Sequence, residues 1–494
     1  MKRWLPRSLC LLAWSFWAWL GFGLYRELPR DFGPVVAQMP EYDQSLTLGF
    51  VGDTNLVLVG PAKRDKREKT SEEVRLQLID AEAGGVVGER IVPAPYLAVG
   101  DRTLPLGPGS GLALFDALGR EGMDDLLTLM RQGVLLSVTP DSEALQALDV
   151  LTGEWRRISR WPVAYVAPHP AKPWAAVVDL EPGSPPPARV VVVDLKSGKK
   201  LFRRDLPLGT KLEIRPFFFP ARNQVVLPLL IPPSKSTDLW RAVHEVWTVA
   251  DPPILETTVD DFEATGFRAT AAANRMYWQG RYQYEGSRLT YVDVYDFQAR
   301  RFLTTLPVAE RPEANGGKHD FSKGLVEPAI APSGRSVLRY GPMTTRTESS
   351  GNSVITIGKP ALYEVGTGRL LWQERPDERL IGVYRDRFLI NEQWESLWKQ
   401  WLPSVNFRTV AWRSLETGAV LFRTSAKTLI NPRRCNAAET LFVHSNGAVY
   451  RMPLRVNWPL LALCQTILAL PLILLWAVLR WRRKRKLRLA SLTP

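Results

Sequence analysis

"VVVVDLKSGKKLFRRD", residues 190–205, contains four valines, an acidic residue, a Ser-Gly pair and a second run of basic and apolar residues. Two apolar runs joined by a short Gly-containing segment are typical of two β-strands connected by a tight turn. Nearly the same phrase recurs as "ALYEVGTGRLLWQER" at 361–375 and as "VAWRSLETGAVLFRT" at 410–424. This recurrence predicts a fold built from one repeated β-hairpin unit.

The repeated phrase has seven copies along the chain. They begin at Asp80, Asp149, Asp194, Thr248, Asp296, Glu364 and Ser414. In several copies the fifth residue is a glycine, which adopts the positive φ of a tight hairpin at little cost; Gly153, Gly198, Gly368 and Gly418 occupy this position. Successive copies start 45 to 69 residues apart. Strand repeats of about 40–50 residues are typical of a β-propeller with one four-stranded blade per repeat.

A second recurring piece precedes several of these phrases. It reads as strand, turn and strand in "VAPHPAKPWAAVVD" (166–179), "FFFPARNQVVLPLL" (217–230) and "AIAPSGRSVLRYG" (329–341). The two pieces together predict an all-β, seven-bladed propeller over residues 46–455. An eighth blade is possible if "TLFVHSNGAVYRM" (440–452) forms its own sheet; alternatively, this segment completes the first blade with strands near 46–60. A series of hairpins in a β-sandwich is the other interpretation.

The pairing of "APSGRSVL" with "DLKSGKKLF" resembles the WD40-like and quinoprotein-like repeat propellers. Quinoprotein repeats end in Asp-x-x-Thr-Gly-x-x-x-Trp, which "EVGTGRLLW" (364–372) resembles with Glu for Asp. The resemblance spans about residues 46–455 and implies a propeller fold. The chain lacks the adjacent cysteines common in quinone-dependent propeller dehydrogenases. We therefore do not carry over their activity, and we expect no cofactor.

Each end of the chain carries an uncharged apolar segment. The first, "SLCLLAWSFWAWLGFGLY", covers 8–25, and the second, "WPLLALCQTILALPLILLWAVL", covers 458–479. About 20 helical residues cross a bilayer, so each segment predicts a transmembrane helix. No small-residue cleavage site follows the first, which favours an uncleaved signal anchor over a cleaved signal peptide. A buried core helix is the alternative for the second, but aromatic residues near both of its ends favour the membrane.

The basic residues lie mainly outside these two segments. Subtracting three at the N-terminal end and seven at the C-terminal end from the net charge of +14 leaves +4 for the rest, which argues against nucleic-acid binding. Cytoplasmic flanks are rich in Lys and Arg, so both termini are expected in the cytoplasm and residues 26–457 on the other side. The seven C-terminal residues are expected to contact anionic lipid; they are Arg480, Arg482, Arg483, Lys484, Arg485, Lys486 and Arg488.

These patterns divide the chain into five parts. They are a basic flank and signal-anchor helix (1–29), a linker (30–45), the propeller (46–455), a second transmembrane helix (456–480) and a basic cytoplasmic tail (481–494). Two insertions are expected within the propeller: a short helix in "GMDDLLTLMRQG" (122–133) between two glycines, and a polar loop at 309–324.

Residues for catalysis or metal binding are sparse. The chain has three cysteines and no CxxC motif, and its four histidines are far from HExxH spacing. "GPGSG" (107–111) differs from a nucleophile elbow, because proline stands two positions before its serine. We predict no catalytic, cofactor-binding or metal-binding residue from these patterns.

One segment has the pattern of an interaction surface. In "NEQWESLWKQWLP" (391–403), Trp394, Leu397, Trp398 and Trp401 form one apolar stripe if the segment is helical. Packing of this stripe on the propeller is the favoured interpretation, and contact with lipid headgroups or a partner helix is the alternative.

The expected function is that of a membrane-anchored, extracytoplasmic binding or scaffolding platform for a protein or glycan ligand. The alternative is a hydrolase or oxidoreductase with its active site at the central channel. Carboxylates and histidines gathered at one mouth of the ring would favour the enzyme, and a mouth without perturbed acids would favour the platform.

Overall fold

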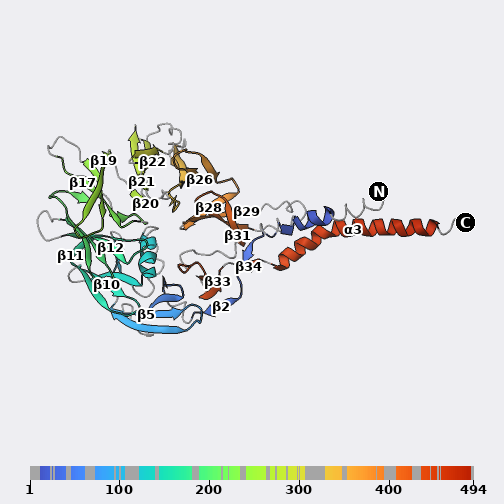
Figure 1. Cartoon of the computed structure of the whole chain (residues 1–494), viewed down its shortest axis with the longest axis horizontal. Helices are drawn as coiled ribbons and strands as arrows, with labels where there is room; N and C mark the ends of the chain where they lie inside the picture. The colour runs from blue at the N-terminus through green and yellow to red at the C-terminus, as the bar shows by residue number, and fades with distance from the viewer. Residues whose placement is uncertain are drawn as a thin grey trace.

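A computed structural model of the 494-residue chain shows a ring of β-sheets with a helical arm that leaves one side (Figure 1). The structure describes residues 12–19, 21–22, 25, 28–39, 46–61, 73–93, 96–99, 102–105, 122–139, 144–180, 188–212, 215–220, 222–233, 241–262, 268–272, 275–284, 287–296, 299, 301–305, 329–347, 353–384, 386–393, 408–425, 435–444, 447–452, 455–456 and 458–490. The all-β propeller predicted from the repeats is confirmed.

Three sheets have four strands in chain order. The first contains β3 (Leu46–Val51), β4 (Asn55–Pro61), β5 (Glu73–Asp80) and β6 (Val86–Pro93). The second contains β20 (Arg268–Ala272), β21 (Arg275–Tyr284), β22 (Ser287–Asp296) and β23 (Arg301–Thr305). The third contains β24 (Ala329–Ile330), β25 (Ser336–Thr347), β26 (Ser353–Glu364) and β27 (Leu370–Gln373).

Two further sheets carry extra strands on a blade. One contains β15 (Lys211–Leu212), β16 (Phe217–Phe218), β17 (Gln224–Ile231), β18 (Arg241–Thr248) and β19 (Ile254–Phe262). The other continues from β28 (Glu378–Tyr384), β29 (Arg387–Gln393), β30 (Arg408–Ser414) and β31 (Val420–Ser425) into β1 (Arg30–Asp31) and β34 (Arg455–Val456). With the three regular sheets, these make about five separate blades.

The remaining strands of the ring form one eight-stranded sheet. Its strands are β7 (Tyr96–Val99), β8 (Arg102–Pro105), β9 (Val134–Val138), β10 (Ala144–Asp149), β11 (Trp155–Pro168), β12 (Trp174–Leu180), β13 (Ala188–Asp194) and β14 (Lys200–Asp205). The 14-residue β11 pairs with β10 through its first half and with β12 through its second half. Because β11 pairs with strands on both sides, the eight strands form one continuous sheet and do not divide into separate blades. The expected count of seven blades is therefore not supported.

The repeated hairpin has one local structure. The carboxylates of Asp80, Asp149 and Asp194 each accept two backbone N–H groups, two and three residues further on. The fifth residue then adopts a φ of 73° at Gly84, 75° at Gly153, 71° at Gly198, 68° at Gly368 and 73° at Gly418. The turn predicted from the glycine positions is confirmed, and the acid that starts the better copies closes it.

The four valines of the first quoted stretch reflect the position of β13 inside the ring. Val191 and Val193 pack in a cluster with β9 and β10 of the same sheet, and Val190 and Val192 pack against the following sheet. All four are at most 1% exposed. A strand buried on both faces carries a continuous apolar run instead of an alternating pattern.

The ring closes through strands in the segment that we interpreted as a linker. Within 30–45, β2 (Val35–Gln38) pairs with β33 (Ala448–Arg451), which pairs with β32 (Leu441–Val443). The terminal pair therefore forms its own sheet and does not complete the sheet β3–β6, which already draws its four strands from consecutive chain. Among the described residues of this segment, 30–39, six are in strands, too few for a periodic signal.

The expected helix within 122–133 is confirmed, since residues 122–131 are helical. Met123, Leu126 and Met130 pack in the core cluster formed with the first sheet. At Gly49, whose φ is 147°, a Cβ would lie 3.2 Å from Leu127. The glycine thus lets the helix approach strand β3 closely.

Two helical segments form the arm. Residues 12–19 are helical near the N-terminus, and α3 (Trp458–Ala490) follows the last strand. In the part of the chain that the structure describes, no helix is both long enough and apolar enough to cross a membrane. The two transmembrane helices therefore stay a prediction.

Candidate functional site

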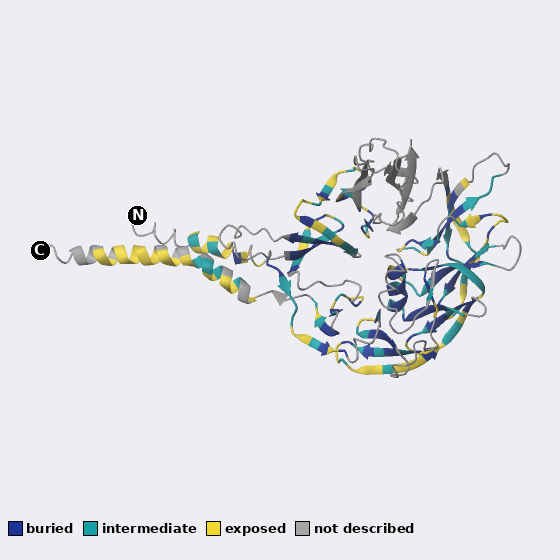
Figure 2. Cartoon of the chain, turned by 180° about the vertical axis from the view of Figure 1, so that it is seen from behind, coloured by how far each residue is buried: buried dark blue, intermediate teal, exposed yellow. Residues whose placement is uncertain are grey.

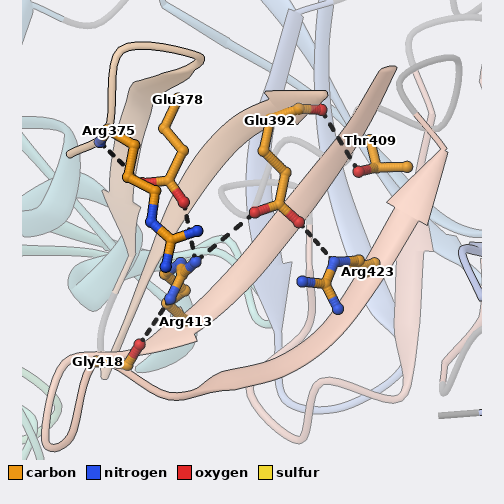
Figure 3. Close-up of polar contacts among 7 residues, drawn as sticks. All are labelled: Arg375, Glu378, Glu392, Thr409, Arg413, Gly418 and Arg423. Carbon is orange, nitrogen blue, oxygen red and sulfur yellow. Dashed lines mark hydrogen bonds and ion pairs between the residues drawn. The ribbon is translucent and has the colours of Figure 1, made fainter. Parts of the chain in front are cut away.

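A cluster of charged side chains is buried in the sheet β28–β31 (Figure 3). Glu378 at the start of β28 and Glu392 near the end of β29 are direct cross-strand partners. The Glu378 side chain is 3% exposed and that of Glu392 is 8% exposed. Two carboxylates placed opposite each other repel, so this register requires compensating cations.

Arg413 of β30 compensates both acids. Its Nη2 lies 3.0 Å from Oε1 of Glu378 and 3.6 Å from Oε2 of Glu392, and its Nη1 donates to the carbonyl of Gly418 in the β30–β31 turn. The Arg413 side chain is only 12% exposed, and its guanidinium lies 5.6 Å from the ring centroid of Trp372 in β27. Burial lowers the pKa of Arg413, whereas the charges of the two glutamates raise it.

Two more arginines complete this arginine–carboxylate network. Arg423 of β31 pairs with Glu392, and the backbone N–H of Arg375 donates to Glu378 over 3.1 Å. Both carboxylates therefore have a cationic partner. The network instead ties together the strands of the sheet that also receives β1 and β34.

Sequence reasoning missed this network. Its ion-paired glutamates and arginines lie 21 to 35 residues apart, and only the strand register brings them together. The one available signal was the presence of arginines in the otherwise apolar hairpin at 410–424.

The three described histidines do not gather at one site. His169 is buried in the turn between β11 and β12 and His244 in β18, and burial lowers the pKa of each to about 4. The Nδ1 atom of His169 accepts the backbone N–H groups of Ala171 and Lys172 at 3.0 and 3.1 Å. His444 packs against Phe32 in the closing sheet, and the fourth histidine lies outside the described residues.

Stability is expected to fall as the pH is lowered from about 6.5 towards 4. The two buried histidines stay neutral in the folded state over this range, whereas the unfolded chain binds protons. Each contributes a loss of up to about 1.4 kcal/mol per pH unit. Urea unfolding at several pH values gives the free energy of unfolding as a function of pH. The slope of this free energy against pH should be shallower for the double variant His169→Gln/His244→Gln. A slope equal to that of the unchanged protein would contradict this assignment.

A buried acid lies in a third place. Asp179 of β12 is 5% exposed and accepts a hydrogen bond from Ser159 Oγ at 2.6 Å. Burial raises the pKa of Asp179, although the hydrogen bond lowers it. Among the described residues, no group of three or more His, Cys, Asp or Glu side chains could hold a metal ion. The perturbed groups are thus dispersed over the ring.

The tryptophan stripe at 394–401 lies outside the described residues, so its packing stays a prediction. The segment joins β29 to β30, and the residues that flank it, Gln393 and Arg408, are cross-strand partners. The residues expected to contact anionic lipid all belong to α3. Arg480, Arg482, Lys484 and Arg485 are exposed, and the side chains of the other three are outside the described set.

No family model matches the chain, and no curated protein matches it. Solved structures similar to it include the β-propeller domain of the trilobed protease from Pyrococcus furiosus, with 9% identity, a TM-score of 0.38 and coverage of 75% of this chain and 95% of that one. The acylaminoacyl peptidase of Pyrococcus horikoshii has 8% identity and a TM-score of 0.35 over 76% of this chain. This chain spans about half of that peptidase, 52%.

The quinohemoprotein alcohol dehydrogenase ADHIIG of Pseudomonas putida HK5 is 10% identical, with a TM-score of 0.38 over 80% of this chain and 69% of its own. At such similarity, the fold assignment rests on the sheets themselves. They define a β-propeller protein. The comparisons do not confirm the WD40-like or quinoprotein-like family that the repeats resemble.

Proposed function

We propose that this protein is a membrane-anchored, extracytoplasmic β-propeller that acts as a binding or scaffolding platform for a protein or glycan ligand. The observation that carries the proposal is the exposed apolar surface of the arm (Figure 2). In the N-terminal helical segment Leu12, Trp14, Phe16 and Trp19 are 54–67% exposed. In α3 the same holds for Leu463, Leu474 and Trp476, at 55–64%.

Exposure of these apolar side chains to water is energetically unfavourable. Contiguous exposed apolar surface of this size is uncommon on soluble proteins and marks contact with a membrane or another protein. The apolar sequence 458–479 has 22 residues without a charge and includes several whose side chains lie outside the described set. Its full length is sufficient to cross the hydrocarbon core of a bilayer.

The basic end of α3 supports the orientation. The helix continues past the apolar sequence to Ala490, and Arg480 and Arg485 lie 5.0 and 5.4 Å from the rings of Trp476 and Trp481. Aromatic and basic residues of this kind favour the headgroup region, and positive flanks favour the cytoplasm. The ring then lies on the extracytoplasmic side.

The chemistry of the ring favours a platform over an enzyme. In the described residues, the glutamates of the arginine–carboxylate network are paired with arginines, and the buried histidines are held neutral at neutral pH. These groups stabilise strands and turns.

Membrane anchoring is tested by flotation of the full chain with phosphatidylcholine–phosphatidylglycerol vesicles. We expect the unchanged protein to float after an alkaline wash and the variant Leu470→Arg/Leu474→Arg/Trp476→Arg to remain with the soluble fraction. The matched control, Val86→Arg/Val87→Arg/Ile91→Arg on exposed positions of β6, should still float. Equal flotation of both variants would contradict an anchor at α3.

Orientation is tested with protease added to intact cells. The protein should lose its 26–457 region and keep a tag placed after Pro494. Loss of the tag with an intact ring would reverse the orientation.

A further inference from the structure

The helical arm joins the ring through two short connections. Only residue 457 separates β34 from α3, and four residues separate Tyr25 from β1. The rings of Tyr25 and Trp458 have centroids 6.0 Å apart. Strands β1 and β34 then pair directly, with Arg30 opposite Val456 and Asp31 opposite Arg455.

The residues around this strand pair are packed against the ring. Leu28 is 1% exposed, and the Phe32 ring stacks on Tyr450 at 4.2 Å and on Phe442 at 5.6 Å. Arg30 lies over the ring of Phe422, and β1 also pairs in parallel with β31. A junction made of paired strands and stacked rings transmits orientation, unlike a Gly/Ser-rich linker.

The two helical segments of the arm also form one unit. The indole N–H of Trp17 donates to the backbone carbonyl of Gln465 over 3.3 Å. Gly21 is buried at the contact, where a Cβ would lie 1.8 Å from Nε2 of Gln465. Small residues that allow such close approach, and polar side chains at the contact, are typical of paired helices in membranes.

The direction of the arm relative to the ring is visible in Figure 1. The view is down the shortest axis of the molecule and shows the ring face-on, with α3 extending away from the rim across the view. Figure 2 shows the same arrangement from behind. In both views the arm therefore extends outward from the rim of the ring and does not cross either of its faces.

We infer that the ring stands upright on the membrane, with its rim towards the bilayer and its central axis parallel to the membrane surface. The inference rests on the proposed function, because it requires the arm to be the anchor. The arm crosses the bilayer along its normal, apart from a tilt of about 20° that is common for spanning helices. The sheets next to β1 and β34 then lie nearest the lipid, and the strands β10–β14 lie farthest away.

An upright ring determines how a partner reaches it. Both faces of the ring are open to the side and neither is turned towards the bilayer. A ligand of either face therefore lies alongside the ring, in the same layer above the membrane. This arrangement suits the extracytoplasmic domain of a second protein anchored in the same membrane.

The repeated hairpins provide equivalent labelling positions around the ring, and the distance of each from the membrane tests this orientation. Five of them have an exposed residue just before a turn glycine, and equivalent turns of a propeller lie on one face of the ring. These positions are Ala83, Thr152, Ser197, Thr367 and Thr417. Single cysteines there, in the full chain with Cys10, Cys435 and Cys464 replaced by alanine, carry a fluorophore. The protein is inserted in phosphatidylcholine–phosphatidylglycerol vesicles that contain a headgroup-attached quencher.

Quenching is expected to be strongest at Thr417→Cys, intermediate at Thr367→Cys and Ala83→Cys, and weakest at Thr152→Cys and Ser197→Cys. Equal quenching at all five positions, in protein that floats with the vesicles, would mean a flat ring and would overturn the inference while the anchor stands. Failure of the labelled protein to float would overturn the anchor and the upright ring together. Thermal melting identifies any labelled variant that unfolds. If Ala83→Cys or Ser197→Cys unfolds, the neighbouring Glu82→Cys or Lys196→Cys takes its place in the quenching measurement.

Discussion

Replacing Arg413 with methionine is expected to lower the free energy of unfolding by about 3–5 kcal/mol, because breaking a buried ion pair leaves a charge uncompensated. Glu378 and Glu392 lie opposite each other and share Arg413. Without it Glu378 loses its guanidinium partner, and the two carboxylates repel across the strand pair. Urea unfolding of the detergent-solubilised chain measures the loss.

Two further variants separate this effect from the loss of a surface charge. Arg203→Met removes an arginine that is 54% exposed and pairs with Asp205, and should cost only about 0–1 kcal/mol. Adding Glu378→Gln to Arg413→Met should restore part of the stability, since it removes the carboxylate that is left without a guanidinium partner. If Arg413→Met costs no more than Arg203→Met, the network does not stabilise the sheet.

Removal of residues 1–39 is expected to destabilise the ring by about 5 kcal/mol or more relative to removal of residues 1–27. The longer deletion takes away β1, β2 and the buried side chains of Ala37 and Met39, which pack with Leu441 and Val449. It also removes Phe32 from its aromatic stack. Losing one buried Met or Phe side chain costs about 2–5 kcal/mol.

Thermal melting and limited proteolysis of the two truncated chains measure this difference. A synthetic peptide of residues 28–39 should raise the melting temperature of the chain that begins at residue 40, because it restores the edge of β33. The same peptide should not change the melting temperature of the chain that begins at residue 28. Equal melting of the two chains would show that the closing strands contribute little.

Local sequence patterns predicted the repeated unit because the turn is held by nearby residues. At Asp194 the carboxylate accepts N–H groups two and three residues on, and Gly198 supplies the positive φ, so one short phrase contains the whole hairpin. The helix at 122–131 is likewise encoded within its own residues. The number of blades could not be predicted from the sequence. It depends on the pairing of β11 with β10 on one side and with β12 on the other, which no local pattern indicates.

Long-range pairing accounts for what the sequence did not reveal. Strands β1 and β2 have two and four residues, and their partners are more than 390 residues away. The charged side chains around Arg413 come from three strands, and no local sequence pattern predicts the register of those strands. Both predicted interaction surfaces stay predictions: the tryptophan stripe lies outside the described residues, and the exposure of the described basic residues of α3 does not test their contact with lipid.

The pairing of the two chain ends has a consequence for biosynthesis. Strand β1 leaves the ribosome early, but its partner strands β31 and β34 are among the last to be made. At about 5–20 residues per second, β1 waits for tens of seconds without a partner. During that time the unclosed ring exposes strand edges and apolar faces that favour aggregation. We therefore expect the nascent chain to depend on chaperones until its final strands have been translated.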